Sequence, residues 1–494
     1  MATRSTCIAW ERILQKALAE LAIAIDLQPQ TTWAQIEIRG ICEDTRRLNP
    51  GELFVAISGR DRDGRGFINQ AVERGAAAVV SEDSLDLPVP VLTVQSARAA
   101  LARLSAAFHD HPTRDLFAVG VTGTNGKTTV SHWTAELLGR GETRLLSTVQ
   151  NSLSGISGLT TPSSSVIQRL ARQAAADGMD NLVLEASSAG ISQDRVSHVD
   201  FDACVFTNFS PEHLNHHGGV DAYRSAKLKL FENLNPEAWA VVNADDPMHS
   251  AIAEATSAQV LSYGIHAEAD LRASDIHASA YGSQFTLVTR EGETQTVSVP
   301  LPGRHNVANA LAAIGVGMVK GVPLGPLSER LAAAVPIPGR IEFFRRTDGA
   351  LVVIDFAHNA SSLEVMLRLL RSEYARVVVV FGCPGDSELK KRTAMGAVSG
   401  RWADVVVLTS DNPKNEDPTV IADAILAGMA SSAVPVTFVL DRARAIQLAL
   451  SQASAGDVVL LAGKGHETEQ LIGNKRVRYS DASVLRELGF VAGH

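Results

Sequence analysis

Short apolar runs alternate with longer amphipathic segments along most of this 494-residue chain. Runs of β-branched and aliphatic residues are typical of strands buried on both faces of a parallel sheet, and the segments between them have helical spacing. The predicted strands are 52–56, 76–80, 117–121, 181–185, 203–208, 240–246, 351–355, 376–381, 404–408 and 457–461. This alternation predicts an α/β protein with parallel sheets and helices on both faces.

Turn-rich segments divide the pattern into three units, which agrees with a usual domain size of about 150 residues. A predicted helix over 97–108 leads to a first break around Pro112, and a proline-rich segment ending at Gly339 forms a second break. Alternating residues near 279–299 indicate a small antiparallel insertion, which is followed by a helix over 307–320. We predict domains over 1–112, 113–337 and 338–494.

Composition excludes several classes of protein. The 45 lysines and arginines against 54 acidic residues give a net charge of −9, and no basic run occurs, so a nucleic-acid binder is not expected. The four cysteines show no metal-binding spacing and indicate buried thiols in a reducing compartment. We find neither a signal peptide nor an apolar run near the roughly 18 residues that span a membrane. We therefore expect a cytoplasmic protein without nucleic-acid or membrane partners.

A glycine-containing loop follows the predicted strand over 117–121, and a helix follows the loop. Glycines there let backbone N–H groups close on phosphate oxygens where a Cβ would clash. The lysine can reach the terminal phosphates, and the next hydroxyl can ligate Mg²⁺. Val121 replaces the first glycine of the common G-x-x-x-x-G-K-[ST] spacing, but the strand–loop–helix context still predicts nucleotide binding. The predicted nucleotide-binding residues are Gly123, Thr124, Asn125, Gly126, Lys127, Thr128 and Thr129.

Three other residues are candidates for metal chemistry. Glu185 ends a predicted buried strand, where its carboxylate suits Mg²⁺ beside the phosphates, although it could instead cap the next turn. His213 lies in a loop with three histidines, whose loose spacing favours a role beside Mg²⁺ over a zinc site. Lys227 lies on a predicted helix, and its spacing alone favours a solvent-facing lysine.

Further short motifs occur in order along nearly the whole chain. They include Asp44-Thr45-Arg46, Thr160-Thr161-Pro162, Glu185-Ala186-Ser187-Ser188, Gly303-Arg304-His305-Asn306, Pro338-Gly339-Arg340, Asp355-Phe356-Ala357-His358, Asp411-Asn412-Pro413 and Gly463-Lys464-Gly465-His466-Glu467. Together with the glycine loop they resemble the Mur ligases of peptidoglycan synthesis, and among these the type that adds the third residue of the stem peptide (MurE type). The resemblance implies a UDP-sugar-binding N-terminal domain, a central P-loop ATPase domain with a parallel sheet, and a Rossmann-like C-terminal domain that binds an amino acid.

The resemblance also implies the chemistry. ATP would phosphorylate the terminal carboxylate of a UDP-N-acetylmuramoyl dipeptide, and the amine of an amino acid would attack the acyl phosphate. Such a reaction needs charge neutralisation around the transferring phosphoryl group. Lys127 and Thr128 with two Mg²⁺ would supply it, with Glu185 and His213 at the metal site and Lys227 carbamylated as a further ligand. By the same resemblance, residues around the adenine, ribose and phosphates would be Asn306, Arg340, Asp355 and His358.

The acceptor and amino-acid sites differ in how well they match the family. For the muramoyl-peptide acceptor, all five family positions are retained: Thr160, Thr161, Ser187, Gln193 and Arg195. For the amino acid, the motif Asp-Asn-Pro-Arg of diaminopimelate-using relatives is here Asp411-Asn412-Pro413-Lys414, and Ser387 replaces a carboxylate-reading arginine. Gly463 and Glu467 are retained, and Glu467 would meet the far amino group of a diamino acid.

Three readings of these departures stay open. Nearby cations could compensate for the missing arginines: Lys390, Lys391, Arg392 or Lys414. Alternatively, the chain could be a paralogue that joins a different amino acid or acceptor in specialised metabolism, or a catalytically silent paralogue that only binds UDP-sugar peptides. The intact phosphate and metal set favours an active enzyme, which we expect to be monomeric.

Overall fold

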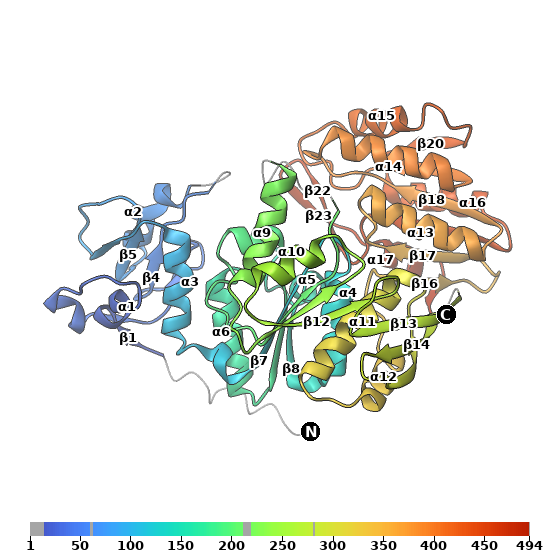
Figure 1. Ribbon diagram of the computed structural model, residues 1–494. Helices are drawn as coiled ribbons and strands as arrows, with labels where there is room; N and C mark the ends of the chain where they lie inside the picture. Colours follow the sequence, from blue (N-terminus) through green and yellow to red (C-terminus); the bar gives the residue numbers. More distant parts are fainter. Residues whose placement is uncertain (1–13, 60–62, 211–218, 280–281, 494) are drawn as a thin grey trace, which may run out of the picture.

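The computed structural model describes residues 14–59, 63–210, 219–279 and 282–493. Three main sheets follow one another along the chain and form three lobes, coloured blue, cyan through green to yellow, and orange to red in Figure 1. The predicted three-domain α/β class is therefore confirmed. No helix in the described ranges is long and apolar enough to cross a membrane.

The N-terminal lobe is built on a parallel sheet in the order β3-β4-β5-β6. Alternate residues of β4 point to opposite faces: Leu53 and Val55 pack with α1 and α3, whereas Phe54 packs with α2. Its strands and helices are β1 (Lys16–Ala17), α1 (Leu18–Ala24), β2 (Glu37–Ile38), β3 (Ile41–Cys42), β4 (Leu53–Val55), α2 (Ile68–Glu73), β5 (Ala78–Ser81), β6 (Val91–Thr93) and α3 (Ala97–Phe108).

The central lobe carries a nine-stranded sheet in the order β15-β14-β13-β12-β11-β10-β7-β9-β8. Strands from β8 to β13 run parallel, and β14 and β15 extend the sheet antiparallel. The strands are β7 (Phe117–Thr122), β8 (Thr143–Leu146), β9 (Asn181–Glu185), β10 (Ala203–Phe206), β11 (Trp239–Asn243), β12 (Gln259–Gly264), β13 (Leu271–Ser279), β14 (Gly282–Thr289) and β15 (Thr294–Val299).

Helices cover both faces of the central sheet. One face packs against α4 (Lys127–Leu137), α11 (Arg304–Val319) and α12 (Leu324–Ala332). The other face packs against α6 (Ser164–Ala176), α9 (Val220–Glu232) and α10 (Met248–Ala255). Two short helices, α5 (Thr148–Leu153) and α7 (Ser188–Ser192), follow the carboxyl ends of β8 and β9. Ligands bind at such strand ends in open α/β sheets, and the central candidate residues lie there.

The C-terminal lobe has a seven-stranded sheet in the order β20-β19-β18-β21-β17-β16-β24, in which β16 and β24 pair antiparallel at one end. Its strands are β16 (Glu342–Arg345), β17 (Leu351–Asp355), β18 (Arg376–Phe381), β19 (Val405–Thr409), β20 (Val436–Val439), β21 (Asp457–Ala462) and β24 (Val491–Ala492), with the separate hairpin β22 (Glu469–Ile472) and β23 (Lys475–Arg478). Its helices are α13 (Ala360–Glu373), α14 (Leu389–Trp402), α15 (Pro418–Gly428), α16 (Arg442–Gln452) and α17 (Asp481–Glu487).

The predicted elements agree closely with the observed ones, with a few differences at their ends. The insertion expected near 279–299 is the β13–β15 meander, which begins earlier, at Leu271, because β13 first continues the parallel sheet beside β12. Helix α11 starts at Arg304 rather than at 307. The domain limits at 112 and 337 stay a prediction, which the sheets at 41–93, 117–299 and 342–492 accommodate.

Candidate active site at the junction of the lobes

The glycine loop predicted to bind phosphate, called the phosphate loop below, covers residues 123–126 and joins β7 to α4. Gly123 has φ +145° and Gly126 has φ +87°, a region that favours glycine, and a Cβ at these positions would collide with Thr207 Oγ1 and Asn309 Oδ1 respectively. Helix α4 begins at Lys127, so the unpaired N–H groups of its first turn face the loop and make an anion site.

Residues after β10 hold this loop in shape. The Asn125 carbonyl accepts from Thr207 Oγ1 at 2.6 Å and from Asn208 Nδ2 at 3.0 Å, and the Asn125 N–H donates to Asn208 Oδ1 at 2.9 Å. The Lys127 ammonium donates to the Gly123 and Thr124 carbonyls, both at 2.9 Å. Sequence reasoning missed Thr207 and Asn208, although both belong to a predicted strand that ends in polar residues.

The C-terminal lobe reaches this loop through Arg340 and Asn359. The Arg340 guanidinium donates to Thr128 Oγ1 at 3.0 Å, and Asn359 Nδ2 donates to Asn125 Oδ1 at 3.2 Å. Burial lowers the pKa of Arg340, which also lies 4.8 Å from the centroid of the Phe356 ring. Arg340, predicted from the third domain, therefore contacts Thr128, predicted from the second.

Asp355 and His358 lie beside Arg340 at the end of β17. Asp355 accepts from the backbone N–H of Ile341 at 3.0 Å and of Ala357 at 2.8 Å, and burial raises the pKa of its carboxyl. His358 Nδ1 lies 2.9 Å from the Phe356 carbonyl oxygen. These contacts fix both side chains next to residues 333–341, the segment between α12 and β16 that joins the two larger lobes and is called the hinge below.

Asn306 lies in the first turn of α11, on the other side of the loop. Its Nδ2 donates to the Pro302 carbonyl at 2.8 Å, and its Oδ1 accepts from Asn309 at 3.1 Å. Asn309 in turn lies against Gly126, so the start of α11 adjoins the phosphate loop.

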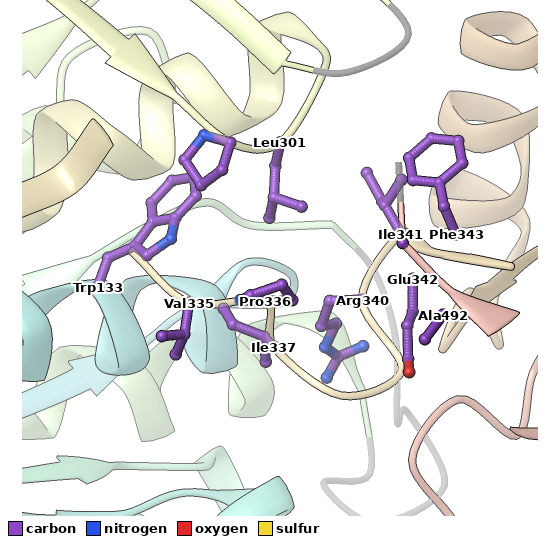
Figure 2. Close-up of a pocket in the computed structure, with 12 residues that line it drawn as sticks. Trp133, Leu301, Val335, Pro336, Ile337, Arg340, Ile341, Glu342, Phe343 and Ala492 are labelled. Atoms are coloured by element: carbon purple, nitrogen blue, oxygen red, sulfur yellow. The ribbon is translucent and has the colours of Figure 1, made fainter. Parts of the chain in front are cut away.

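A cavity of about 180 Å³ lies at the hinge beside Arg340. Figure 2 shows apolar side chains from α4, from the loop before α11 and from the hinge around it, including Trp133, Leu301, Pro336 and Ile337. Because Arg340 both lines this cavity and contacts Thr128, the cavity adjoins the phosphate loop.

The candidate metal residues lie near the same loop as far as the structure describes them. Glu185 is buried, and its two carboxylate oxygens accept from the Thr148 N–H at 2.9 Å and the Thr148 hydroxyl at 3.0 Å. His213 lies outside the described residues. Within the described residues, no group of three or more His, Cys, Asp and Glu side chains could hold a metal ion.

Lys227 is buried, with 1% of its surface exposed, so the solvent-facing position predicted from spacing alone is wrong. Helix α9 turns this face toward the sheet, and the Lys227 Nζ lies 4.6 Å from the centroid of the Tyr223 ring. The Tyr223 hydroxyl lies 3.2 Å from Thr124 Oγ1, which links α9 to the phosphate loop.

The five predicted acceptor residues lie together beyond the end of β9. Thr161 Oγ1 donates to the Glu185 carbonyl at 2.7 Å and lies 2.9 Å from Ser187 Oγ. Thr160 Oγ1 accepts from Thr148 Oγ1 at 3.1 Å. Arg195 donates to the Thr161 carbonyl at 2.9 Å and to Gln193 Oε1 at 2.6 Å.

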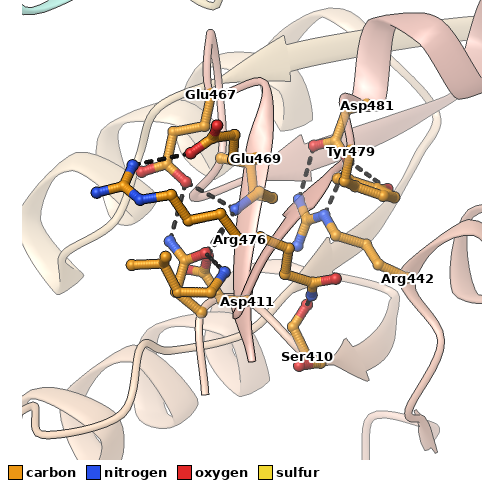
Figure 3. A network of polar contacts seen from close by, with 12 residues as sticks. Ser410, Asp411, Arg442, Glu467, Glu469, Arg476, Tyr479 and Asp481 are labelled. Atoms are coloured by element: carbon orange, nitrogen blue, oxygen red, sulfur yellow. Dashed lines mark hydrogen bonds and ion pairs between the residues drawn. The ribbon is translucent and has the colours of Figure 1, made fainter. Parts of the chain in front are cut away.

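The predicted amino-acid site contains a buried polar network, which Figure 3 shows in part. Glu467 accepts from the Lys464 ammonium at 2.7 Å and from Asn412 Nδ2 at 2.9 Å, and Lys464 lies 3.4 Å from Asp411. Burial raises the pKa of Asp411. Gly463, with φ +99°, directly follows β21 beside this network. Lys464 belongs to the motif at 463–467 but was not predicted to be a site residue.

Ser387 and Lys414 lie at the outer edge of this network. Ser387 Oγ accepts from Arg392 Nε at 3.1 Å, and Arg392 makes a two-pronged pair with Glu416 at 2.5 and 2.7 Å. Arg392 is therefore occupied within the protein. The Lys414 ammonium lies 3.3 Å from Asp386, and its side chain is 40% exposed, which leaves it accessible to a ligand.

Three family models match successive parts of the chain. They are the Mur ligase family catalytic domain at residues 37–109, the Mur ligase middle domain at 121–317 and the Mur ligase glutamate ligase domain at 339–465. A UDP-N-acetylmuramoyl-L-alanyl-D-glutamate–2,6-diaminopimelate ligase of Geobacillus thermodenitrificans is 39% identical over 455 residues, covering 90% of this chain and 93% of the relative. An enzyme of the same name from Gloeobacter violaceus is 39% identical over 461 residues, covering 92% and 94%.

Solved structures agree with these matches. A structure of a UDP-N-acetylmuramoyl-L-alanyl-D-glutamate–2,6-diaminopimelate ligase superposes with a TM-score of 0.67 at 30% identity, covering 96% of this chain and 98% of that chain. MurF from Acinetobacter baumannii, at 23% identity and a TM-score of 0.69, shares the fold. The resemblance seen in the motifs is thus confirmed over nearly the whole length, and the chain belongs to the Mur ligase family of ATP-dependent ligases.

Proposed function

We propose that this chain joins an amino acid to UDP-N-acetylmuramoyl-L-Ala-D-Glu with ATP, in the synthesis of peptidoglycan precursors. The observation that supports the proposal is that candidate residues for all three substrates lie on two lobes that are in contact. Arg340 donates to Thr128 beside the phosphate loop, Thr161 of the acceptor set donates to the Glu185 carbonyl, and the Lys464–Glu467 network lies in the C-terminal lobe. We also infer that the enzyme is a cytoplasmic monomer.

The reaction follows from this arrangement. A terminal carboxylate oxygen of the acceptor attacks the γ-phosphorus of ATP, which releases ADP and leaves an acyl phosphate. The amine of the amino acid then attacks the acyl carbon, loses a proton, and inorganic phosphate leaves as the amide forms. Lys127, the loop N–H groups and Arg340 neutralise charge on the phosphoryl group. The hydroxyls of the acceptor-site residues Thr160, Thr161 and Ser187, together with the Arg195 guanidinium, would orient the acceptor carboxylate for attack on the γ-phosphorus.

The donor set fits Mg²⁺, because the Thr128 hydroxyl and the Glu185 carboxylate are hard oxygen ligands. Bound Mg²⁺ would neutralise phosphate charge, with His213 as an additional residue of this site. Lys227 would join it after its amine attacks CO₂ and loses a proton to give a carbamate.

The base of ATP would occupy the hinge cavity. A nucleotide whose phosphates lie in the loop extends past Arg340, and the cavity beside it is apolar and bounded by Trp133. A flat aromatic ring suits such walls. Quenching of tryptophan fluorescence by ADP, lost in Trp133→Phe, would support this assignment; unchanged quenching in the variant would contradict it.

The amino acid we propose is diaminopimelate, which the names of the relatives specify for those proteins. Lys414 would bind the distal carboxylate in place of the missing arginines, and Glu467 would bind the distal ammonium. In the structure the Lys414 ammonium lies 3.3 Å from the Asp386 carboxylate.

The test is phosphate release with ATP, Mg²⁺ and the dipeptide acceptor, across meso-diaminopimelate, L-lysine, L-ornithine and short neutral amino acids. Turnover with diaminopimelate, absent in Lys127→Ala, is the expected result. Turnover only with another amino acid would identify a paralogue of changed specificity. No turnover despite acceptor binding would identify a silent binding protein.

A further inference from the structure

An arginine of the N-terminal lobe reaches into the predicted acceptor site. Arg98 lies in the first turn of α3 and is partly buried. Its Nη2 donates to the Ser58 carbonyl at 2.9 Å, and its Nη1 lies 3.4 Å from Gln193 Oε1 in the central lobe. The side chain therefore bridges two lobes at a position that no motif singled out.

Arg98 meets a second arginine at this point. Arg195 donates to the same Gln193 oxygen at 2.6 Å and to the Thr161 carbonyl at 2.9 Å. Two guanidinium groups thus converge on one neutral amide oxygen. Among the residues that the structure describes, neither arginine forms an ion pair with a carboxylate, and their hydrogen-bond acceptors are uncharged oxygens.

The surroundings leave this pair without a full countercharge. Burial lowers the pKa of Arg195, and repulsion by Arg98 lowers it further, against a weaker opposing attraction from Glu43. Glu43 is engaged elsewhere, because its carboxylate accepts from Ser165 Oγ at 2.8 Å. Like charges held together at a lobe junction are stabilised when an anion binds between them.

We propose that Arg98 is an acceptor-binding residue, which forms with Arg195 a guanidinium pair across the lobe junction that takes an oxyanion of the UDP-linked acceptor. This inference rests on the proposed function. Guanidinium groups bind phosphate and carboxylate oxygens through two parallel N–H donors, which an amide oxygen cannot fully use. The oxyanion is either the diphosphate or a carboxylate of the dipeptide.

Steady-state phosphate release with Arg98→Ala tests the proposal. We expect the KM for the acceptor to rise about 10- to 100-fold, the range for losing a charged hydrogen-bond donor, while the KM for ATP changes less than about two-fold. Arg98→Lys should recover part of the loss, because it keeps the charge without the fork. Arg103→Ala is the matched control, since Arg103 lies on the same helix and pairs with the exposed Asp26 at 2.6 Å.

Calorimetric titration separates the two sources of the oxyanion. Weaker binding of UDP alone to Arg98→Ala assigns the contact to the diphosphate, whereas weaker binding of only the complete acceptor assigns it to a dipeptide carboxylate. An acceptor KM equal to that of the unmodified enzyme would overturn the proposal. Absence of turnover in the unmodified enzyme would instead refute the proposed function. Should Arg98→Ala unfold, Arg98→Gln and Arg98→Lys give the same readout.

Discussion

The burial of Lys227 is the residue-scale feature that spacing failed to predict. The Lys227 side chain has 1% of its surface exposed, and its Nζ lies 4.6 Å from the centroid of the Tyr223 ring. Its position on α9, one helical turn from a tyrosine that contacts the phosphate loop, would bring the proposed carbamate close to that loop.

We expect Lys227→Ala to lower phosphate release by at least about 100-fold, because the proposed carbamate ligand of the Mg²⁺ that would neutralise phosphoryl charge is lost. Added acetate or formate should restore part of the rate by supplying a carboxylate in the vacated space. Lys229→Ala on the same helix is the control, since Lys229 pairs with Asp194 at 3.0 Å and its side chain is 45% exposed. Full activity of Lys227→Ala would rule out the carbamate.

Lys414 is the second residue whose role can be measured directly. If it binds the distal carboxylate, Lys414→Ala should lower kcat/KM for diaminopimelate by about 10- to 100-fold, the usual cost of losing a hydrogen bond to a charged group. Lys414→Arg should retain or raise it, because the guanidinium fork fits a carboxylate better. Lys390→Ala, at an exposed position of α14, should change nothing. Equal kcat/KM in all three variants would show that another cation binds the distal carboxylate of the substrate.

Two buried histidines make stability depend on pH. Burial lowers the pKa of His466 to about 3 and that of His132 to about 4. An unfolded histidine has a pKa of about 6.5, so below that pH the unfolded chain binds more protons, and the free energy of unfolding falls as the pH falls. We expect a loss of about 2 kcal/mol from each of them between pH 7 and pH 4.5.

Urea denaturation across this range measures the effect. His466→Gln should make the free energy of unfolding depend less on pH, whereas His266→Gln, at an exposed position, should not. If the free energy of unfolding of the His466 variant fell with pH as steeply as that of the unmodified protein, other groups would be responsible for the pH dependence.

At the scale of elements, the hinge segment between the larger lobes depends on one glycine. Gly339 has φ +69°, and a Cβ there would collide with the backbone at Gly465 and His466. Its carbonyl also accepts from the Phe356 N–H at 3.0 Å, which ties the hinge to the end of β17. The two loops can approach only because position 339 has no side chain.

Gly339→Ala should therefore destabilise the protein by more than the strain of a positive φ alone, which is about 1 kcal/mol. Gly349→Ala separates the two effects, because Gly349 has φ +87° with open space around it. We expect a total of about 3 kcal/mol for position 339 and a loss of ATP turnover, since Arg340 is the next residue. Equal melting temperatures of the two variants would contradict the steric argument.

The sequence predicted buried elements well because burial leaves a local signal. Strands β9, β17 and β18 match their predicted ranges, since valine-rich runs between turns identify strands covered on both faces. Hairpin β22–β23 escaped prediction because its residues are largely exposed and charged, as in Lys475 and Arg476. Its pairing comes from the fold and has no periodic hydrophobic pattern.

The site was predictable only where short motifs carried it. Lys127, Arg340 and Glu467 were found from their motifs, but Thr207 and Arg98 were not, because they act through partners more than 80 residues away in the chain. Such contacts follow from the parallel pairing of β7 with β10 and from the docking of α3. The pattern of residues along the chain does not indicate this strand pairing or this helix docking.

At the scale of the whole molecule, hydrogen bonds between described residues join the C-terminal lobe to the phosphate loop. One runs from Arg340 to Thr128 and another from Asn359 to Asn125, and both end on residues of the predicted nucleotide site. A nucleotide bound in the loop would therefore influence the position of the C-terminal lobe, which carries the predicted amino-acid site. Closure of the lobes around the substrates would bring the amine toward the acyl phosphate.

Asn359→Ser tests this coupling without removing the helix cap. Asn359 caps α13 by accepting from the Ser362 N–H at 2.7 Å, and serine is a good cap that is too short to reach Asn125. We expect the melting temperature to change little, because the lost contact contributes about 1 kcal/mol, while the KM for ATP rises about three- to ten-fold. Small-angle scattering should show a larger radius of gyration for the variant with ADP and acceptor bound. An unchanged KM together with unchanged scattering would mean that the lobes hold their relative position through the apolar hinge contacts alone.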